Sequence, residues 1–556
     1  MEKQYRLISQ SASAYGYPLL VKSLLHTPTL YAPDQEIVYR DRVRLTYREF
    51  RARIGRLAAG LKRLGVGPGD TVAVLDWNSH RYLECFFAVP MMGAVLHTVN
   101  VRLSPEQMLA TMIHAEDAVV LVYEDFLPVL EDFRDKLSGV RAFIVLTDSE
   151  APVETLLPVA GEYEEILSQV DDEFSFPDFP EDVQATLFYT TGTTGEPKGV
   201  CFSHRHIVLH TLSVGLAVSG LVGPARFQSS DVYMPFTYMF HVHAWGFPYV
   251  ATLLATKQVY TGRFDPESML RLIERERVTF SHGVPTILQL LLDHPLAKEI
   301  DLTRWKINTG GMGLPRGLAR RAMERGIEIF HGYGMSETCP VLTLANLKPH
   351  MTAWDPERQL DFLTKTGFPL PLVELSVVDS AGTRLPRDGI SAGEIVVRAP
   401  WCTQGYLKDP DRSEALWKDG RLHTGDLAHQ DPEGYIHITD RMKDVVKSGG
   451  EWISSLDLES LLSRHHAVAE AAVFGVPDQT WGERPAALVV LKEGYAGRTT
   501  ETDLKAFLLG FVEQGVISKW AVPDRFLFVD EVPKTSTGKF DKKLIRAQFA
   551  AHNERI

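Results

Sequence analysis

The chain has 556 residues, too many for one hydrophobic core, and its length predicts two or three domains. Its 45% hydrophobic and 23% charged residues are ordinary for a globular protein. The net charge of −13 argues against nucleic acid as the main partner, because phosphate contacts need clustered Lys and Arg. The four cysteines are scattered and form no C-x-x-C pair, so we expect no disulfide, no structural zinc site and a cytoplasmic location. The first residues lack an apolar signal core, and no apolar run is long enough to span a membrane.

Short apolar segments and helical segments alternate in the first half of the chain. Residues 71–76, 93–98, 119–123 and 142–146 are predicted strands, and a helix is predicted over 81–92. This alternation predicts helices on a largely parallel sheet, hence an α/β fold. Residues 149–182 are acidic and contain proline, so we expect a loop-rich connection there.

The second half changes character twice. Short predicted strands at 374–378 and 393–398 indicate a small β-rich subdomain. After residue 440 a new unit begins, with a predicted helix at 455–463 and predicted strands at 470–474 and 486–491. About a hundred residues can form an α+β domain of their own. We therefore predict a large N-terminal domain of parallel-sheet α/β subdomains plus the β-rich subdomain, 1–440, followed by a small C-terminal α+β domain, 441–556.

A Gly- and Thr-rich loop at residues 189–199 is the most informative motif. Glycines let backbone N–H groups approach an anion closely, Thr hydroxyls add donors, and a Lys adds a point charge, so the loop suits a polyphosphate. Two residues separate the second Gly from the Lys, unlike in a P-loop. A flexible surface turn is the alternative. The candidate phosphate contacts are Thr190, Thr191, Gly192, Thr193, Thr194, Gly195 and Lys198.

Four further motifs follow in order: His331–Thr338 (HGYGMSET), Arg421–Asp426 (RLHTGD), Asp440–Glu451 (DRMKDVVKSGGE) and Pro533–Lys539 (PKTSTGK). Together with the loop they resemble the motifs of the acyl-adenylate-forming superfamily, which includes acyl-CoA synthetases, luciferases and peptide-synthetase adenylation domains. The resemblance covers nearly the whole chain. It implies that the large domain binds ATP and a carboxylic acid, and that a mobile small domain carries the catalytic lysine and the CoA channel.

The chemistry of adenylation explains the residue types. A carboxylate attacks the α-phosphate, so a metal and cationic groups must neutralise the developing charge. Glu337 is the candidate magnesium ligand, a hard oxygen donor, with Thr190 as a second contact. Outside its motif, Glu337 would read equally well as a solvated acid at a helix start. Asp426 can accept both ribose hydroxyls, although alone it would read as a turn residue. The resemblance further implies nucleotide contacts from Gly311, His331, Gly332, Tyr333 (stacked on adenine), Ser336, Arg441 and Lys447.

The small domain is expected to supply the remaining groups. The resemblance makes Lys539 the catalytic cation between the carboxylate and the α-phosphate, and Lys443 the hinge about which the small domain rotates after adenylation. The face with Gly449, Gly450 and Trp452 would then arrive at the site. Gly449 and Gly450 have no side chains, which leaves room for a narrow thiol channel. A solvated lysine and a simple β-turn are the alternatives.

The segment 233–249 is dense in aromatic residues and Met and resembles the acyl site of the superfamily. Amino-acid adenylation domains place an Asp where His241 stands, and this segment contains no carboxylate, so the substrate is not expected to be an amino acid. Apolar walls favour a hydrocarbon tail. His241, Val242 and Trp245 resemble the acyl-site residues of long-chain fatty acyl-CoA synthetases, in which a Trp gates the tunnel. Ordinary core packing is the alternative reading.

We therefore predict a ligase that uses ATP and Mg²⁺ to form acyl-AMP and diphosphate from a medium- or long-chain fatty acid, and then acyl-CoA and AMP with coenzyme A. His241 would order the acyl pocket or nearby ATP groups. Activation of an aryl, branched or short acid, transfer to a carrier protein, and a non-catalytic sensor of fatty acids or nucleotides stay open. Peripheral membrane contact and a homodimer stay open too.

Overall fold

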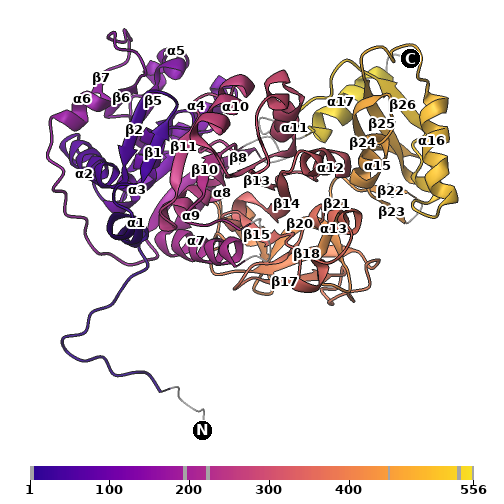
Figure 1. Ribbon diagram of the computed structural model, residues 1–556, viewed down its shortest axis with the longest axis horizontal. Coiled ribbons are helices and arrows are strands. Elements are labelled where there is room, and N and C mark those ends of the chain that lie inside the picture. Colours follow the sequence, from indigo (N-terminus) through magenta and orange to yellow (C-terminus); the bar gives the residue numbers. More distant parts are fainter. Residues whose placement is uncertain (1–5, 192–196, 221–225, 449–450, 535–539, 554–556) are drawn as a thin grey trace.

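The computed structural model of the chain describes residues 6–191, 197–220, 226–448, 451–534 and 540–553 (Figure 1). In this part of the chain the strands form four sheets. The first two are built from residues up to Pro369, and the third follows them in the chain. The fourth lies at the far end of the molecule's long axis, with α15 (Ser455–Leu462), α16 (Glu501–Glu513) and α17 (Lys542–Asn553) (Figure 1).

The first sheet has seven strands, parallel except for the antiparallel pair β8–β9. Its interior strand β5 is buried at every residue, as expected for a parallel sheet covered on both faces. In sheet order the strands are β7 (Val159–Glu162), β6 (Ala142–Leu146), β5 (Asp117–Tyr123), β3 (Thr71–Leu75), β4 (Val95–Thr98), β8 (Gln184–Thr191) and β9 (Pro197–Ser203).

The second sheet has nine strands, with a parallel centre and antiparallel edges at β2, β15 and β16. In sheet order they are β16 (Phe368–Pro369), β15 (Val341–Leu344), β14 (Glu328–Gly334), β13 (Lys306–Thr309), β12 (Phe280–Gly283), β10 (Val232–Pro235), β11 (Lys257–Tyr260), β1 (Glu36–Tyr39) and β2 (Val43–Thr46).

The third and fourth sheets are mostly antiparallel and have five strands each. The third contains β17 (Glu374–Val378), β18 (Gly393–Arg398), β20 (Arg421–Gln430), β19 (Trp417–Lys418) and β21 (Ile436–Arg441). The fourth contains β23 (Glu451–Ile453), β22 (Val446–Ser448), β25 (Gly482–Leu491), β24 (Val468–Asp478) and β26 (Arg525–Phe528), which runs parallel to β25.

Helix α3 (His80–Met91) shows how the two large sheets share a core. All of its residues are buried, and it contacts β3, β4 and β8 of the first sheet and β1 of the second. Its charged residues are paired inside the protein, Arg81 with Asp148 at 3.0 Å and Glu84 with Arg53 at 2.7 Å, as buried charges require. Helix α2 has a capping box, in which the Thr46 side chain and Glu49 satisfy each other's backbone N–H groups.

The α-helices are α1 (His26–Tyr31), α2 (Tyr47–Arg63), α3 (His80–Met91), α4 (Pro105–Ala115), α5 (Leu127–Glu131), α6 (Tyr163–Ser168), α7 (His204–Ser219), α8 (Val242–Trp245), α9 (Phe247–Leu253), α10 (Pro266–Glu276), α11 (Pro285–Asp293), α12 (Arg316–Glu324), α13 (Pro356–Leu363), α14 (Pro410–Leu416), α15 (Ser455–Leu462), α16 (Glu501–Glu513) and α17 (Lys542–Asn553). Short 3₁₀ turns are η1 (Val21–Leu25), η2 (Glu124–Phe126), η3 (Arg134–Lys136), η4 (Pro295–Lys298), η5 (Ser336–Thr338), η6 (Pro349–Met351) and η7 (Lys519–Ala521).

The α/β fold class is confirmed, and the predicted strands and helices exist with small shifts at their ends. Strand β4 begins at Val95 and not at the predicted Gly93, because Gly93 has φ +84° and turns the chain before the strand. The expected loop-rich connection 149–182 also contains β7 and α6. Both elements are too short to give a periodic signal.

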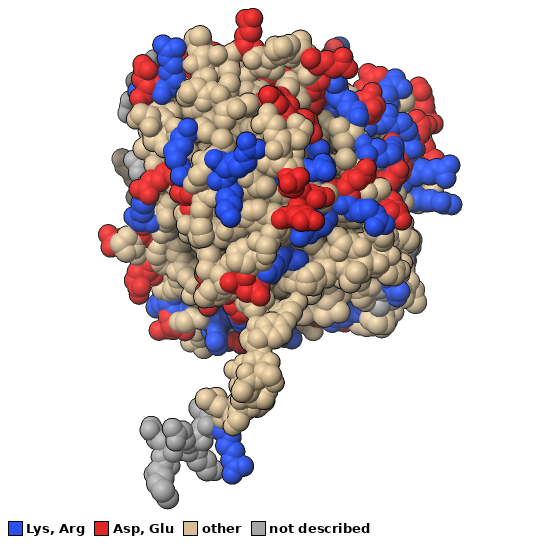
Figure 2. All heavy atoms as spheres, turned by 90° about the vertical axis from the view of Figure 1, so that its left-hand side faces the viewer, with Lys and Arg blue, Asp and Glu red and all other residues tan. Residues whose placement is uncertain are grey.

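Figure 2 shows the N-terminal side of the molecule, on which Lys and Arg are interspersed with Asp and Glu. The segment 6–18 projects from this side as an exposed tail without helix or strand (Figures 1 and 2). None of the helices described here is long and apolar enough to cross a membrane.

Candidate active site

The Thr- and Gly-rich loop joins the antiparallel strands β8 and β9 at the edge of the first sheet. Thr190 on β8 is paired in register with Lys198 on β9. This pairing places the candidate phosphate contacts of both strands at one end of the hairpin. The predicted contacts Gly192, Thr193, Thr194 and Gly195 lie outside the described residues, as does the side chain of Thr191.

Glu337 lies in η5, the turn that follows β14 at the carboxyl end of the second sheet. Its side chain is largely buried and accepts a hydrogen bond of 2.7 Å from the Tyr406 hydroxyl to Oε1. The ammonium group of Lys198 lies 4.7 Å from the centre of the same tyrosine ring. Burial, and Glu337 beside it, hold the pKa of Tyr406 well above its usual range, so the phenol keeps its proton and donates.

Backbone contacts fix the segment that carries Tyr406. The Leu407 N–H donates to the Gly199 carbonyl at 2.8 Å, which ties this segment to β9. The Thr403 N–H donates to the Glu337 carbonyl at 2.8 Å, and the Thr403 hydroxyl donates to the Cys201 carbonyl at 2.9 Å. The segment from Thr403 to Leu407 thus joins the β8–β9 hairpin to the turn that carries Glu337.

A second polar cluster is built from β14 and β20. The Tyr333 hydroxyl donates to Asp426 Oδ2 at 2.7 Å, and Arg441 Nε lies 3.4 Å from Asp426 Oδ1. Asp426 and Arg441 are opposite each other on β20 and β21. Burial and the neighbouring Asp426 raise the pKa of Tyr333 well above its usual range. Three predicted nucleotide contacts, distant in the sequence, therefore meet around one carboxylate.

The remaining large-domain contacts lie where β13 and β14 end, the edge at which open α/β sheets bind their ligands. Burial lowers the pKa of His331 to about 4, so its ring is neutral and pairs with the Thr309 hydroxyl at 3.0 Å. A Cβ at Gly332 would lie 2.9 Å from the Leu344 side chain and 3.1 Å from the Thr343 carbonyl oxygen, so this strand position favours glycine. Gly311 has φ +79°, and Ser336 lies partly buried in η5.

The predicted acyl segment forms an unusual turn. The four residues of the element labelled α8, Val242–Trp245, all have φ between +47° and +58°, so α8 is a left-handed turn, which L-residues rarely adopt, and not a right-handed helix. His241 precedes the turn at φ −92°. Val242 and Trp245 are buried, and a Cβ on Gly310 would lie 3.2 Å from the Trp245 ring. The acyl segment therefore meets the end of β13, beside Gly311.

His243 in the same turn has no predicted role. It is fully buried, and neither ring nitrogen has a hydrogen-bond partner. Aromatic side chains surround it, namely Phe86, Phe188, Phe202 and Tyr249. Burial lowers the pKa of His243 to about 3, so it is neutral at physiological pH.

Of the predicted C-terminal site residues, Lys443 lies near the Asp426 cluster: burial and then the neighbouring Arg441 lower its pKa, and Asp426 acts in the opposite direction. Lys447 and the half-exposed Trp452 face each other across the β22–β23 pair. Arg546 donates to the Lys443 carbonyl at 3.3 Å. Among the described residues, no hydrogen bond or ion pair joins Lys443, Lys447 or Trp452 to Glu337 or Asp426. Lys539, Gly449 and Gly450 lie outside the described residues.

The donor set suits magnesium better than a transition metal. No group of three His, Cys, Asp or Glu side chains that could hold a metal occurs in the described chain. Magnesium in nucleotide enzymes is commonly held by one or two carboxylates together with substrate phosphates. The buried Glu337 carboxylate, next to the phosphate-loop hairpin, fits that pattern.

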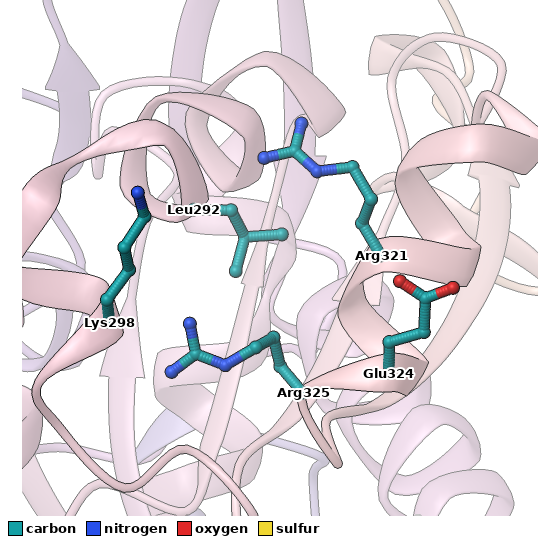
Figure 3. A pocket seen from close by; sticks show the side chains of 5 residues that line it. All are labelled: Leu292, Lys298, Arg321, Glu324 and Arg325. Atoms are coloured by element: carbon teal, nitrogen blue, oxygen red, sulfur yellow. The ribbon is translucent and has the colours of Figure 1, made fainter.

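A surface pocket of about 200 Å³ lies elsewhere, between α11, η4 and α12 (Figure 3). Lys298, Arg321 and Arg325 surround an opening with Leu292 at its centre (Figure 3). Arg321 is paired with Asp293 at 2.6 Å, and Arg325 donates to two backbone carbonyls. The pocket contains none of the predicted site residues.

The sequence matches the family model described as AMP-binding enzyme over residues 29–407 and that of the AMP-binding enzyme C-terminal domain over residues 457–539. The chain belongs to the AMP-binding enzyme family. A long-chain-fatty-acid–CoA ligase of Thermus thermophilus is 43% identical to this AMP-binding enzyme, covering 98% of this chain and 94% of that protein. A 3-methylmercaptopropionyl-CoA ligase of Ruegeria lacuscaerulensis is 38% identical, covering 96% and 97%. The crystal structure of ATP-bound MatB from Rhodopseudomonas palustris superposes with a TM-score of 0.81 at 25% identity, covering 96% and 99%.

Tyr406 is the residue at this site that sequence reasoning missed. It lies 69 residues from Glu337 in the sequence, in a segment without a charged motif. A single tyrosine after a glycine carries no signal of its own. Only the pairing of its backbone with β9 shows that it lies beside Lys198.

Proposed function

We propose that this AMP-binding enzyme is an ATP- and Mg²⁺-dependent ligase that converts a medium- or long-chain fatty acid to acyl-AMP and then to acyl-CoA. The observation that carries the proposal is the contact of Trp245 with Gly310 and Gly311. It brings an apolar acyl segment against the strand ends that carry the nucleotide cluster. An acid bound there would present its carboxylate near the α-phosphate.

In this proposal the large domain holds ATP from both ends. Asp426 accepts the ribose hydroxyls, kept in place by Tyr333 and Arg441. Lys198 offers a cation to the phosphates, and Glu337 with Thr190 would hold magnesium. The metal supplies charge neutralisation on the phosphates when two anions meet. Lys539 approaches from the C-terminal unit and orients the carboxylate against the α-phosphate.

The acyl side selects by shape and apolarity. Val242 and Trp245 are buried, and His241 stands at the start of the left-handed turn. Segment 233–249 contains no carboxylate that could pair with an α-ammonium group. An uncharged hydrocarbon tail is therefore the ligand that this segment favours, because burying a charge there without a partner is costly.

We propose that units 1–440 and 441–556 move relative to each other about Lys443 between the two half-reactions. Adenylation needs Lys539 near the phosphates. Thioester formation needs the β22–β23 hairpin, with Lys447, Gly449, Gly450 and Trp452, to form the path for the CoA thiol. Such rotations commonly expose one catalytic face at a time.

A test is ATP–pyrophosphate exchange without CoA, with octanoate, palmitate, benzoate and 3-methylmercaptopropionate as acids. Exchange with octanoate or palmitate is expected. Exchange only with 3-methylmercaptopropionate or benzoate would keep the adenylation chemistry and reject the fatty-acid substrate. No exchange with any acid would favour a sensor that binds nucleotide without catalysis.

A further inference from the structure

Tyr406 uses two parts of its side chain for two groups of opposite charge. Its hydroxyl donates to the Glu337 carboxylate at 2.7 Å, and the face of its ring carries the Lys198 ammonium at 4.7 Å from the centroid. Tyrosine rings attract cations at such distances through their quadrupole. No salt bridge joins Lys198 to Glu337 among the described residues, although both are held by the same ring.

The backbone holds Tyr406 firmly in this place. Its N–H donates to the Ser413 hydroxyl at 2.8 Å, at the first turn of α14. The residue forms a β-bridge with Val200, and its neighbour Leu407 donates to Gly199. The residue is only 9% exposed. The backbone of Tyr406 therefore cannot shift without breaking contacts with two elements, and burial restricts the freedom of the ring between Lys198 and Glu337.

We propose that Tyr406 is a positioning residue that keeps Lys198 and Glu337 apart and separately available, one for the phosphates and one for magnesium. This inference rests on the proposed function of those two residues. A lysine and a carboxylate freed from the tyrosine would attract each other, because opposite charges near a partly buried site interact strongly. Their ion pair would occupy both groups and weaken magnesium binding.

The hydroxyl and the ring can be tested separately. Tyr406→Phe removes the donor to Glu337 and keeps the ring under Lys198. Groups that orient a metal ligand typically contribute about 10–100-fold to metal affinity or activity. We expect about a tenfold rise in the Mg²⁺ concentration that gives half-maximal ATP–pyrophosphate exchange, with the rate at saturating Mg²⁺ within about threefold of the wild type.

Tyr406→Leu removes both interactions. Because Lys198 can then pair with Glu337, we expect a larger fall in the ATP–pyrophosphate exchange rate, about 100-fold, and excess Mg²⁺ should not fully restore this rate. Tyr260→Phe is the matched control, since it removes a buried tyrosine hydroxyl that donates to Gln258 at 2.7 Å, away from these groups. The control should leave the Mg²⁺ dependence unchanged.

A double variant separates positioning from a general structural role. If the hydroxyl acts through Glu337, then Glu337→Gln combined with Tyr406→Phe should be no worse than Glu337→Gln alone. Losses that multiply would overturn the proposal, and so would a Tyr406→Phe enzyme with the Mg²⁺ dependence of Tyr260→Phe.

A binding measurement keeps the inference independent of the acyl substrate. Equilibrium dialysis with ATP, at a subsaturating Mg²⁺ concentration and with EDTA, gives the gain in ATP affinity that magnesium provides. The wild type should show this gain even if no acid supports exchange, and Tyr406→Phe should lose most of it. A gain of equal size in both proteins would overturn the role of Tyr406, whereas absence of exchange with any acid, with that gain intact in the wild type, would overturn only the ligase.

Discussion

The nucleotide side and the acyl side of the site are built in different ways. Around Glu337 and Asp426, each carboxylate has a partner at a defined distance, supplied by Tyr406, Tyr333 or Arg441. Around Trp245 and His243 the side-chain contacts are between rings and apolar atoms, and neither ring nitrogen of His243 has a hydrogen-bond partner.

This difference separates what specifies the reaction from what specifies the substrate. A directed hydrogen bond requires one residue type at one position, whereas packing requires only an apolar group of the right volume. The nucleotide side should therefore respond to single polar changes with large losses of rate. The acyl side should respond with a change in preference among acids.

The largest effect is expected at Lys539, which we propose acts on the nucleotide side from the C-terminal unit. Lys539→Ala should lower acyl-AMP formation about 10²–10³-fold, the usual loss when one group that stabilises a charged transition state is removed. Thioester formation from supplied acyl-AMP should largely survive, as single-turnover assays of each step would measure. Equal loss in both steps would reject the division of labour between the two units.

Glu337→Gln should lower adenylation about 100-fold at moderate Mg²⁺, because the amide is a poorer ligand for a hard cation. Part of the loss should be recovered at high Mg²⁺ in exchange assays. Glu324→Gln, on the rim of the pocket in Figure 3, is the control and should behave as the wild type. If the Glu337→Gln enzyme has the Mg²⁺ dependence of the wild type, Glu337 is not a magnesium ligand.

Asp426→Asn should raise the KM for ATP about 10–100-fold, since hydrogen bonds to a charged group contribute about 1.5–3 kcal/mol. The preference among acids should not change, because Asp426 lies on the nucleotide side. Initial rates at varied ATP would measure both quantities, with the exposed Asp530→Asn as control. A changed preference among acids in Asp426→Asn would contradict the separation of the nucleotide side from the acyl side.

Trp245→Phe should change the preference among acids and leave the KM for ATP almost unchanged. Removing part of the ring that lies against Gly310 enlarges the acyl side, and we expect the ratio of kcat/KM between long and medium acids to change about tenfold. The KM for ATP should stay within about twofold. Trp305→Phe, another buried tryptophan that donates to Ser281 at 3.0 Å, is the matched control. A shift in ATP affinity without a shift in acyl preference would contradict the proposed role.

The smallest effect concerns stability and pH. The folded-state pKa of His243, about 3, lies below its ordinary value of 6.5, so protons bind the unfolded chain better. The contribution of the neutral His243 to the free energy of unfolding is therefore fully present above pH 6.5 and is lost as the pH falls toward 3. Each such histidine contributes a slope of about 1.4 kcal/mol per pH unit. His243→Leu should flatten the decline of Tm between pH 6.5 and 5, whereas the exposed His350→Leu should not. Equal slopes in the wild type and His243→Leu would contradict the buried, neutral state.

Much of the fold and half of the site could be predicted from the sequence. Predominantly apolar strands such as Asp117–Tyr123 and the short polar motifs around Glu337 and Asp426 carry local signals. The left-handed turn could not be predicted, since Val242 is β-branched and such residues rarely have positive φ. Tyr406 acts on residues distant in the chain, so only the three-dimensional pairing of its segment with β9 reveals it.

The measurement that tests the central claim most directly is AMP release with Mg²⁺, ATP and CoA across saturated acids from acetate to palmitate, with benzoate and amino acids as controls. We predict a maximum at medium or long chains and no release with amino acids. A maximum at benzoate or at acetate would contradict the proposed fatty-acyl site at Trp245. No AMP with any acid would contradict the ligase itself.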